Sequence, residues 1–305
     1  MKFAVVLLAI LIMAGSVLGQ TQTGAPTLRI VTEDPNLPSE LYYGDVKVKP
    51  LRLRPGTNQV MGFWDNDYFV YQQYIDFLGR QPDEAGYNDW LSVLNNCTNK
   101  GGLGADIACD RVHVSSGFFR SPEFSMKGQF VYRFYEAALG RLPKYVEWKA
   151  DTRPLNGLSQ GAELEAKQAA YAVDFASRPE FTAKYGTLTQ PANAKAFVEK
   201  LMQTSGITSL ASKETLISQM QSGQKTAAQT LRAYIETKEI WDRFFYRGFV
   251  TMQYFGYLKR DPDQAGWTDW VDVLENGRPS AGIAPGDYRH LIFGFVYSVE
   301  YRERF

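Results

Sequence analysis

Apolar side chains recur along the chain at the spacing of an amphipathic helix, with charged and polar residues between them. The first clear set is Val70, Tyr74, Phe77 and Leu78. These positions follow one another at i, i+4, i+7 and i+8, so they share one face of a helix. Residues 131–139 and 250–258 repeat the spacing. We therefore expect three equivalent helices, each with one buried face.

A short turn and an arginine follow each of these predicted helices. Gly79 and Gly140 stand where the first two helices should end, and glycine readily adopts the left-handed conformation of a helix C-cap. Lys259 holds the same place after the third helix. Because the left-handed conformation strains a residue with a side chain, we expect that turn to differ from the other two.

The sequence repeats most clearly in the segment after each turn, where a second helix is predicted. Nine-residue segments that begin at Pro82 and Pro262 are identical at six positions. A proline suits the first position of a helix, where no N–H is needed. Asp261 with Gln264 resembles a capping box at the start of the later copy.

Two glycines lie inside these predicted second helices, Gly86 and Gly266. A glycine within a helix costs up to about 1 kcal/mol, so its repetition indicates that another helix approaches closely there. Trp90 and Trp270 follow at the same distance and should fill the space around that approach.

A third helix in each copy ends in a shared signature, which reads Phe-x-x-Ser/Arg-x-Glu followed by an aromatic residue. The signature stands at residues 118–124, 175–181 and 295–301, with a weaker form at 234–240. The chain thus divides into four helical units, of which the third is degenerate. Their bounds are residues 67–127, 128–187, 192–245 and 246–305. Such repetition predicts an all-α fold of tandem units with two to three helices each, preceded by a short extended or β-like N-terminal segment.

Residues 1–19 are predicted to be a secretory signal peptide. A positive start at Lys2 precedes an apolar run of 12 residues, and Val17 and Gly19 suit a cut before Gln20. The alternative is an uncleaved anchor, although the run is short for a bilayer. No later stretch approaches 18 apolar residues, so we expect a secreted, extracytoplasmic mature chain without a membrane span.

Residues 20–66 differ from the rest of the chain. They are rich in proline, threonine and asparagine and show few helix signals. Val46 and Val48, with Leu51 and Leu53, predict one or two short extended pieces. We interpret this segment as a linker that includes an edge strand laid on the next domain.

The two cysteines, Cys97 and Cys109, close a short glycine-rich loop. In an oxidising compartment two nearby cysteines usually pair, so a disulfide is expected, with two free buried thiols as the alternative. The spacing differs from Cys-x-x-Cys, which argues against a redox function.

Charge and composition exclude several function classes. The 33 basic residues equal the 33 acidic ones, which argues against a nucleic-acid or anionic-membrane binder. Only two histidines and two cysteines are present, too few for a multi-histidine metal site or a cysteine-rich zinc module. No cofactor is expected.

The repeated residues together resemble a known family, the bacterial domain of unknown function 4214, which is itself similar to the helical linker domain of phycobilisomes. In the first unit the resemblance rests on Phe69, Val70, Leu78, Gly79, Arg80, Pro82, Asp83, Gly86, Trp90, Phe118, Ser121, Glu123 and Phe124. The fourth unit supplies Arg260, Pro262, Asp263, Gly266, Trp270 and Glu300, and the second supplies Arg141 and Glu180. The resemblance covers roughly residues 67–185 and 192–305. It implies a secreted or surface-layer-associated bacterial protein without an assigned catalytic activity.

One catalytic motif matches literally, since residues 157–161 read Gly-Leu-Ser-Gln-Gly. This is the Gly-x-Ser-x-Gly nucleophile elbow of α/β-hydrolases, and His290 lies downstream as a potential base. The elbow requires a strand before Ser159, and the preceding residues lack strand character. We instead expect Ser159 to cap the helix that runs through Glu163 to Phe175.

The two histidines hold equivalent places, because Asp110 precedes His113 as Asp287 precedes His290. Each aspartate is expected to cap the third helix of its unit, with shared metal or proton chemistry as the alternative.

The repeated arginines and glutamates leave two interpretations open. They are Arg80, Arg141 and Arg260 with Glu123, Glu180, Glu239 and Glu300. The arginines could form an anion site, but ion pairs that tie the helices of each unit explain the repetition better. Asp261, Asp263, Asp269 and Asp272 could suggest calcium, but they lack the glycine turn of an EF-hand loop.

Aromatic residues outside the repeat are candidates for stacking on sugar rings or for anchoring a protein. They are Tyr42, Tyr43, Trp64, Tyr68, Trp241 and Tyr246. The sequence therefore favours an exported, non-catalytic binding or scaffold module whose partner is a surface or extracellular protein or polysaccharide. Carbohydrate binding through exposed aromatics and a serine hydrolase that uses Ser159 are the alternatives.

Overall fold

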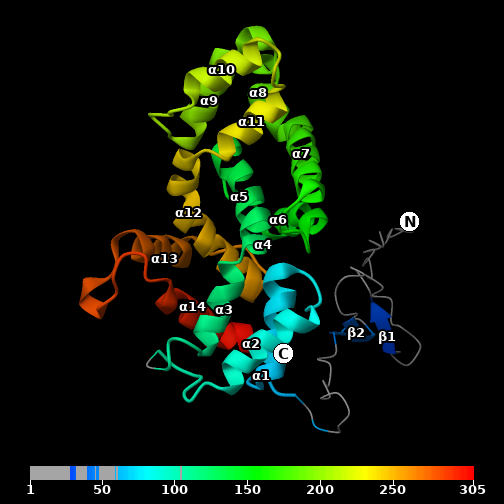
Figure 1. Ribbon diagram of the computed structural model, residues 1–305, viewed down its shortest axis with the longest axis vertical. Coiled ribbons are helices and arrows are strands. Elements are labelled where there is room, and N and C mark those ends of the chain that lie inside the picture. The colour runs from blue at the N-terminus through cyan, green and yellow to red at the C-terminus, as the bar shows by residue number, and fades with distance from the viewer. Residues whose placement is uncertain (1–27, 32–39, 45, 48–58, 60, 104) are drawn as a thin grey trace, which may run out of the picture.

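The computed structural model describes residues 28–31, 40–44, 46–47, 59, 61–103 and 105–305. Helices dominate, so the predicted all-α class is confirmed (Figure 1). The predicted signal peptide and its cut after Gly19 lie outside these residues. Among the helices that the described residues form, none is both long and apolar enough to cross a membrane.

The extended N-terminal segment forms a small antiparallel sheet in the order β1-β2-β3. Its strands are β1 (Leu28–Val31), β2 (Glu40–Tyr43) and β3 (Val46–Lys47). Leu28 pairs with Tyr43, and Tyr42 pairs with Lys47. The predicted extended pieces therefore pair with one another in a sheet of their own, while Val48, Leu51 and Leu53 lie outside the described residues.

Four segments of helices follow, and their places match the four predicted units. The first contains α1 (Asn66–Gln73), η1 (Tyr74–Leu78), α2 (Glu84–Asn95), α3 (Arg111–Phe119) and α4 (Pro122–Phe124). The second contains η2 (Ser125–Gln129), α5 (Phe130–Phe134), η3 (Tyr135–Leu139), α6 (Tyr145–Thr152), η4 (Arg153–Leu155), α7 (Ala162–Ser177), α8 (Pro179–Tyr185) and η5 (Gly186–Leu188). The third contains η6 (Pro191–Asn193), α9 (Ala194–Ser205), α10 (Lys213–Gln221) and α11 (Ala227–Ile235). The last contains α12 (Lys238–Gln253), η7 (Tyr254–Leu258), α13 (Gln264–Asn276), η8 (Pro279–Ala281), α14 (Tyr288–Val296) and α15 (Val299–Arg302).

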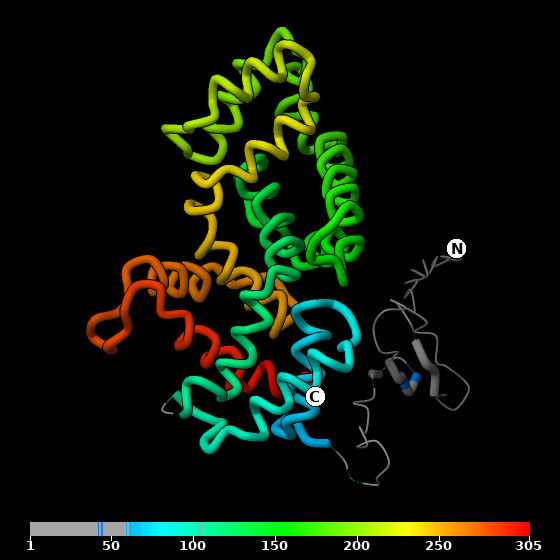
Figure 2. Tube along the Cα trace, viewed as in Figure 1, coloured from blue at the N-terminus to red at the C-terminus, as the bar shows by residue number. Residues whose placement is uncertain are grey.

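The chain folds back on itself, so that its first and last helices lie together. In Figures 1 and 2, α1 to α3 and the orange-to-red helices α13 and α14 form the lower part, while α7 to α11 form the upper part. Helix α14 packs against α3, and α7 packs against α11. The rings of Phe77 and Tyr257 meet edge to face with centroids 4.8 Å apart, which joins η1 to η7 at the centre of the lower part.

Each of the three predicted amphipathic helices ends in one turn of π-helix followed by a left-handed residue. Gly79, Gly140 and Lys259 have φ of 64°, 75° and 54°. The expectation that the Lys259 turn would differ is therefore wrong. The Nζ atom of Lys259 lies 2.9 Å from a carboxylate oxygen of the buried Asp76, and this ion pair offsets the strain of the backbone.

The starts of α2 and α13 differ by one or two residues from the prediction. Asp83 and Asp263 are the N-caps, and their carboxylates accept hydrogen bonds from the backbone N–H groups of Gly86 and Gly266 at 2.9 and 2.8 Å. The prolines stand before the caps instead of at the first helical position, because the aspartates satisfy the free N–H groups better. Asp261 forms no capping box and instead accepts from the backbone N–H of Tyr145.

Close approach at the helical glycines is confirmed. A Cβ atom on Gly86 would collide with the hydroxyl of Tyr74, and one on Gly266 would collide with the hydroxyl of Tyr254. Both tyrosines begin the π-helical turn of the preceding helix. The missing side chain therefore lets the second helix of the unit dock against the end of the first.

Candidate functional site

The repeated arginines bind the repeated glutamates with both arms of the guanidinium. Arg80 donates to the two carboxylate oxygens of Glu123 at 2.8 and 2.9 Å. Arg260 holds Glu300 in the same way at 2.6 and 3.0 Å. The hydrogen bond from Arg260 lowers the pKa of Glu300. Two-armed pairs of this kind fix the geometry of both partners, so these arginines are occupied within the chain.

The second unit carries the same pair with an additional partner. Arg141 donates to Glu180 at 2.8 and 2.7 Å and to Glu147 at 2.9 Å. The third unit departs from this pattern, since its Glu239 accepts from the backbone N–H of Ala211 at 2.9 Å. Each pair joins the turn after a π-helical segment to a helix that lies about 40 residues later in the sequence, which is the structural interpretation of the repeat.

A further recurrent residue was missed by the sequence reasoning. A basic side chain stands four residues after each signature glutamate, as Lys127, Lys184, Arg243 and Arg304. Lys127 and Lys184 donate to the carbonyl oxygens of Leu78 and Leu139 at 2.6 and 2.9 Å. Arg304 donates to that of Tyr257 at 2.5 Å. A cation favours the negative C-terminal end of a helix, so these residues cap the π-helical turns. The constant spacing after the glutamate was the signal that could have revealed them.

Asp76 is the most buried charge where the first and last units meet. Its carboxylate accepts from Lys259 at 2.9 Å, from Arg304 at 3.1 Å and from the hydroxyl of Tyr301 at 2.9 Å. Burial alone would raise the pKa of Asp76, but Arg304 and Lys259 together lower it below its ordinary value. The cluster is electrostatically satisfied within the chain and holds the two units together.

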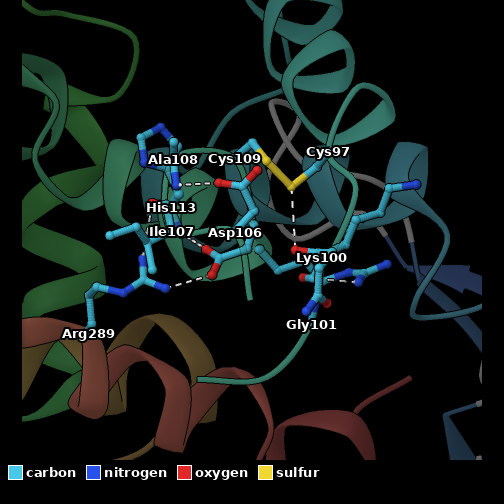
Figure 3. The surroundings of a disulfide bond; sticks show 12 residues. Cys97, Lys100, Gly101, Asp106, Ile107, Ala108, Cys109, His113 and Arg289 are labelled. Carbon is cyan, nitrogen blue, oxygen red and sulfur yellow. Dashed lines mark hydrogen bonds and ion pairs between the residues drawn. A yellow bond between two sulfur atoms is a disulfide. The ribbon is translucent and has the colours of Figure 1, made fainter. Parts of the chain in front are cut away.

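The disulfide between Cys97 and Cys109 is present (Figure 3). Its loop is ordered by Asp106, which accepts from the backbone N–H of Ala108 at 3.2 Å. Figure 3 shows Arg289 reaching this region from α14. Although Asp106 lies beside the two sulfur atoms, the oxidised sulfurs are not thiolates, and thiolates are what a metal would need there.

The helix-cap interpretation of the two aspartates beside the histidines is confirmed. Asp110 accepts from the backbone N–H of His113 at 2.7 Å, and Asp287 accepts from that of Arg289 at 3.0 Å. The other oxygen of Asp287 lies 2.9 Å from Nδ1 of His290. Each histidine thus stands in the first turn of a helix, next to its capping carboxylate.

Ser159 lies in exposed coil between η4 and α7, and no strand precedes it in residues 105–158. The N-cap of α7 is Gly161, with φ of 91°, so the expectation that Ser159 caps this helix is wrong. Glycine takes the cap because its positive φ is strained for a serine.

The four aspartates considered for calcium have separate partners. Asp261 and Asp263 accept from backbone N–H groups as described above. Asp269 forms an ion pair with Arg278, and Asp272 accepts from the side chain of Asn276 at 2.8 Å. The carboxylates therefore serve different local contacts.

The aromatic residues outside the repeat mostly contact other side chains. Tyr68 is buried. Trp64 is 37% exposed, but its ring stacks on Tyr297 with centroids 5.0 Å apart, and Arg111 lies 5.2 Å from its centroid. Arg133 lies 4.7 Å from the ring centroid of Trp241. The side chain of Tyr43 lies outside the description. These rings have little free face for a sugar.

A groove of about 470 Å³ provides a better candidate site. We call it the α12 groove, and it lies where α12 faces η3, α9 and α13. Its lining is Glu136, Gly140, Gln203, Thr204, Ser205, Gly206, Arg243, Phe244, Arg247 and Glu275. Its volume falls within the roughly 300–1,000 Å³ of small-molecule sites. None of its residues carried a site prediction, because they come from segments far apart in the sequence.

Arg243 and Arg247 stand one helical turn apart on α12 and share a face of that helix. Arg247 donates to Glu136 at 2.8 Å and lies 4.6 Å from the ring centroid of Trp267. Glu136 and Glu275 raise the pKa of Arg247 against the opposing effect of burial. Both arginines therefore line the groove as permanent cations.

Comparison with known proteins identifies one family. The sequence profile of the domain of unknown function DUF4214 matches residues 58–128, which include α1 to α4 and the pair of Arg80 with Glu123. A search of curated proteins found no match to the chain. The resemblance predicted from the repeat is therefore confirmed, and over this segment the chain is similar to the DUF4214 family.

Proposed function

We propose that the protein is an exported, non-catalytic binding or scaffold module that acts at the cell surface or outside the cell. The main supporting observation is that its recurrent charged residues pair with one another. Arg80 with Glu123 and Arg260 with Glu300 join helices in equivalent places. A catalytic site is normally built once, whereas a scaffold repeats its joints.

The disulfide supports the compartment, since such bonds persist mainly in oxidising surroundings. The partner we propose is a surface or extracellular protein or a polysaccharide. Nucleic acid is a poor fit, because the chain has no excess of basic residues.

The export part of the proposal is tested by fractionation followed by intact mass analysis. We expect the chain to leave the cytoplasm, to begin at Gln20 and to carry Cys97 and Cys109 oxidised. A full-length chain that stays in the cytoplasm with free thiols would refute it.

The non-catalytic part is tested with a fluorescent serine-reactive probe and a broad panel of hydrolase substrates. We expect no turnover, and equal probe signals for the wild type, for Ser159→Ala and for the matched exposed-serine control Ser222→Ala. Labelling that disappears only in Ser159→Ala, together with turnover, would establish the serine hydrolase instead.

A further inference from the structure

Arg243 departs from its three equivalents in the other units. Lys127, Lys184 and Arg304 donate to carbonyl oxygens at the ends of π-helical turns. Arg243 lies next to Gly206, at the left-handed end of α9, yet it makes no hydrogen bond or ion pair with any residue that the structure describes. The unit with the most divergent sequence thus turns this cation toward the α12 groove.

A second cation accompanies it only in this unit. Arg247 follows Arg243 by four residues, whereas Val131 and Leu188 hold that place in the first two units. Like charges one turn apart destabilise a helix, so the arrangement is costly unless an anion lies between them. Arg247 is already held by Glu136, and its buried Nε has no partner among the described residues.

The remaining polar atoms of the groove are mainly donors. Lys200 binds the side-chain oxygen of Gln203 at 3.0 Å, which leaves its NH₂ group to donate. Tyr185 donates to the hydroxyl of Thr204 at 2.9 Å, which leaves that hydroxyl hydrogen unused. Glu275, also on the groove, offers acceptor oxygens. A donor-rich wall with one acceptor suits a ligand that carries both an oxyanion and hydroxyl groups.

We propose that the α12 groove binds a uronic acid residue of an acidic polysaccharide. The planar guanidinium of Arg243 takes the sugar carboxylate with two hydrogen bonds, and Arg247 adds charge beside it. Gln203 and Thr204 donate to ring and hydroxyl oxygens, and Glu275 accepts from a hydroxyl. This inference rests on the proposed binding function and names its ligand.

The test is titration calorimetry of the mature chain at low and high salt with trigalacturonic acid. Its methyl ester, which has the same sugar rings without the charges, is the matched ligand control, and inorganic sulfate is the control for a simple oxyanion. Arg243→Gln is the test variant. Lys238→Gln removes the same charge from an exposed place on the same helix and is the matched protein control.

We expect the acid to bind, the ester to bind at least tenfold more weakly, and Arg243→Gln to lose at least tenfold while Lys238→Gln changes less than twofold. Arg243 is exposed, so its variant should keep the wild-type melting temperature. Equal binding of acid and ester, or equal affinity of Arg243→Gln and the wild type, would overturn the inference. Full competition by sulfate at equal concentration would overturn the sugar part. None of these failures touches the proposed function, which turnover of a substrate would refute.

Discussion

Replacement of Asp76 by asparagine should destabilise the contact between the first and last units. The substitution keeps the shape of the side chain but removes the charge that Lys259 and Arg304 share. Loss of one partner from a buried ion pair typically costs about 3–5 kcal/mol. We expect a value near the lower end, about 3 kcal/mol, because the side chains of Lys259 and Arg304 are 27% and 24% exposed and can turn toward water.

Urea unfolding followed by circular dichroism measures this loss as a change in the free energy of unfolding. The same loss should lower the melting temperature by about 6–12 °C, at 2–4 °C per kcal/mol for a domain of this size. Asp89→Asn, at an exposed place on α2, is the control and should change the free energy by less than about 0.5 kcal/mol.

The pH dependence of Asp76→Asn provides an independent check. Because the pKa of Asp76 is lowered in the folded chain, its stabilising effect is complete above the ordinary value of 3.8 and is lost as the pH falls through the folded value. The difference between wild type and variant should therefore shrink in acid. A variant as stable as the wild type at pH 7, or a difference that grows in acid, would refute the reasoning.

Three further changes test other parts of the fold. Gly256→Ala should cost about 1–3 kcal/mol in urea unfolding, because its Cβ would collide with an aromatic ring, whereas Gly186→Ala should be nearly neutral, since its nearest neighbour is 3.9 Å away. The double variant Cys97→Ser and Cys109→Ser should lose about 3 kcal/mol for a loop of this length, and reductant should destabilise only the wild type. Burial lowers the pKa of Lys127 to about 7, so the free energy of unfolding should rise between pH 7 and 9.5, and Lys127→Met should flatten that rise by up to about 1.4 kcal/mol per pH unit.

Local features of the fold were predictable because they depend on residues that are close in sequence. The left-handed ends at Gly79 and Gly140 follow from the apolar spacing and the glycine that interrupts it. The close approach at Gly86 follows from the penalty for a helical glycine that recurs. The Lys259 turn was mispredicted because its strain is offset by Asp76, a residue more than 180 positions away.

The candidate site was not predictable in the same way. Periodicity shows which face of a helix is apolar, but not which other helix covers it. The α12 groove depends on α12 facing η3 and α9, so Arg243 could be recognised only as one of many charged helical residues. Its difference from Lys127 lies in a missing contact, which a sequence pattern does not show.

The pairing of the first unit with the last makes the middle of the chain an insertion. Phe63 stacks on Phe305 with ring centroids 5.5 Å apart, so the segment that enters the helical body and the segment that leaves it meet at one place. Units between them branch from a closed base, as Figure 1 shows for the upper helices. Such a design can evolve by lengthening or replacing its middle while the base stays intact, and the groove lies on the part that is freest to change.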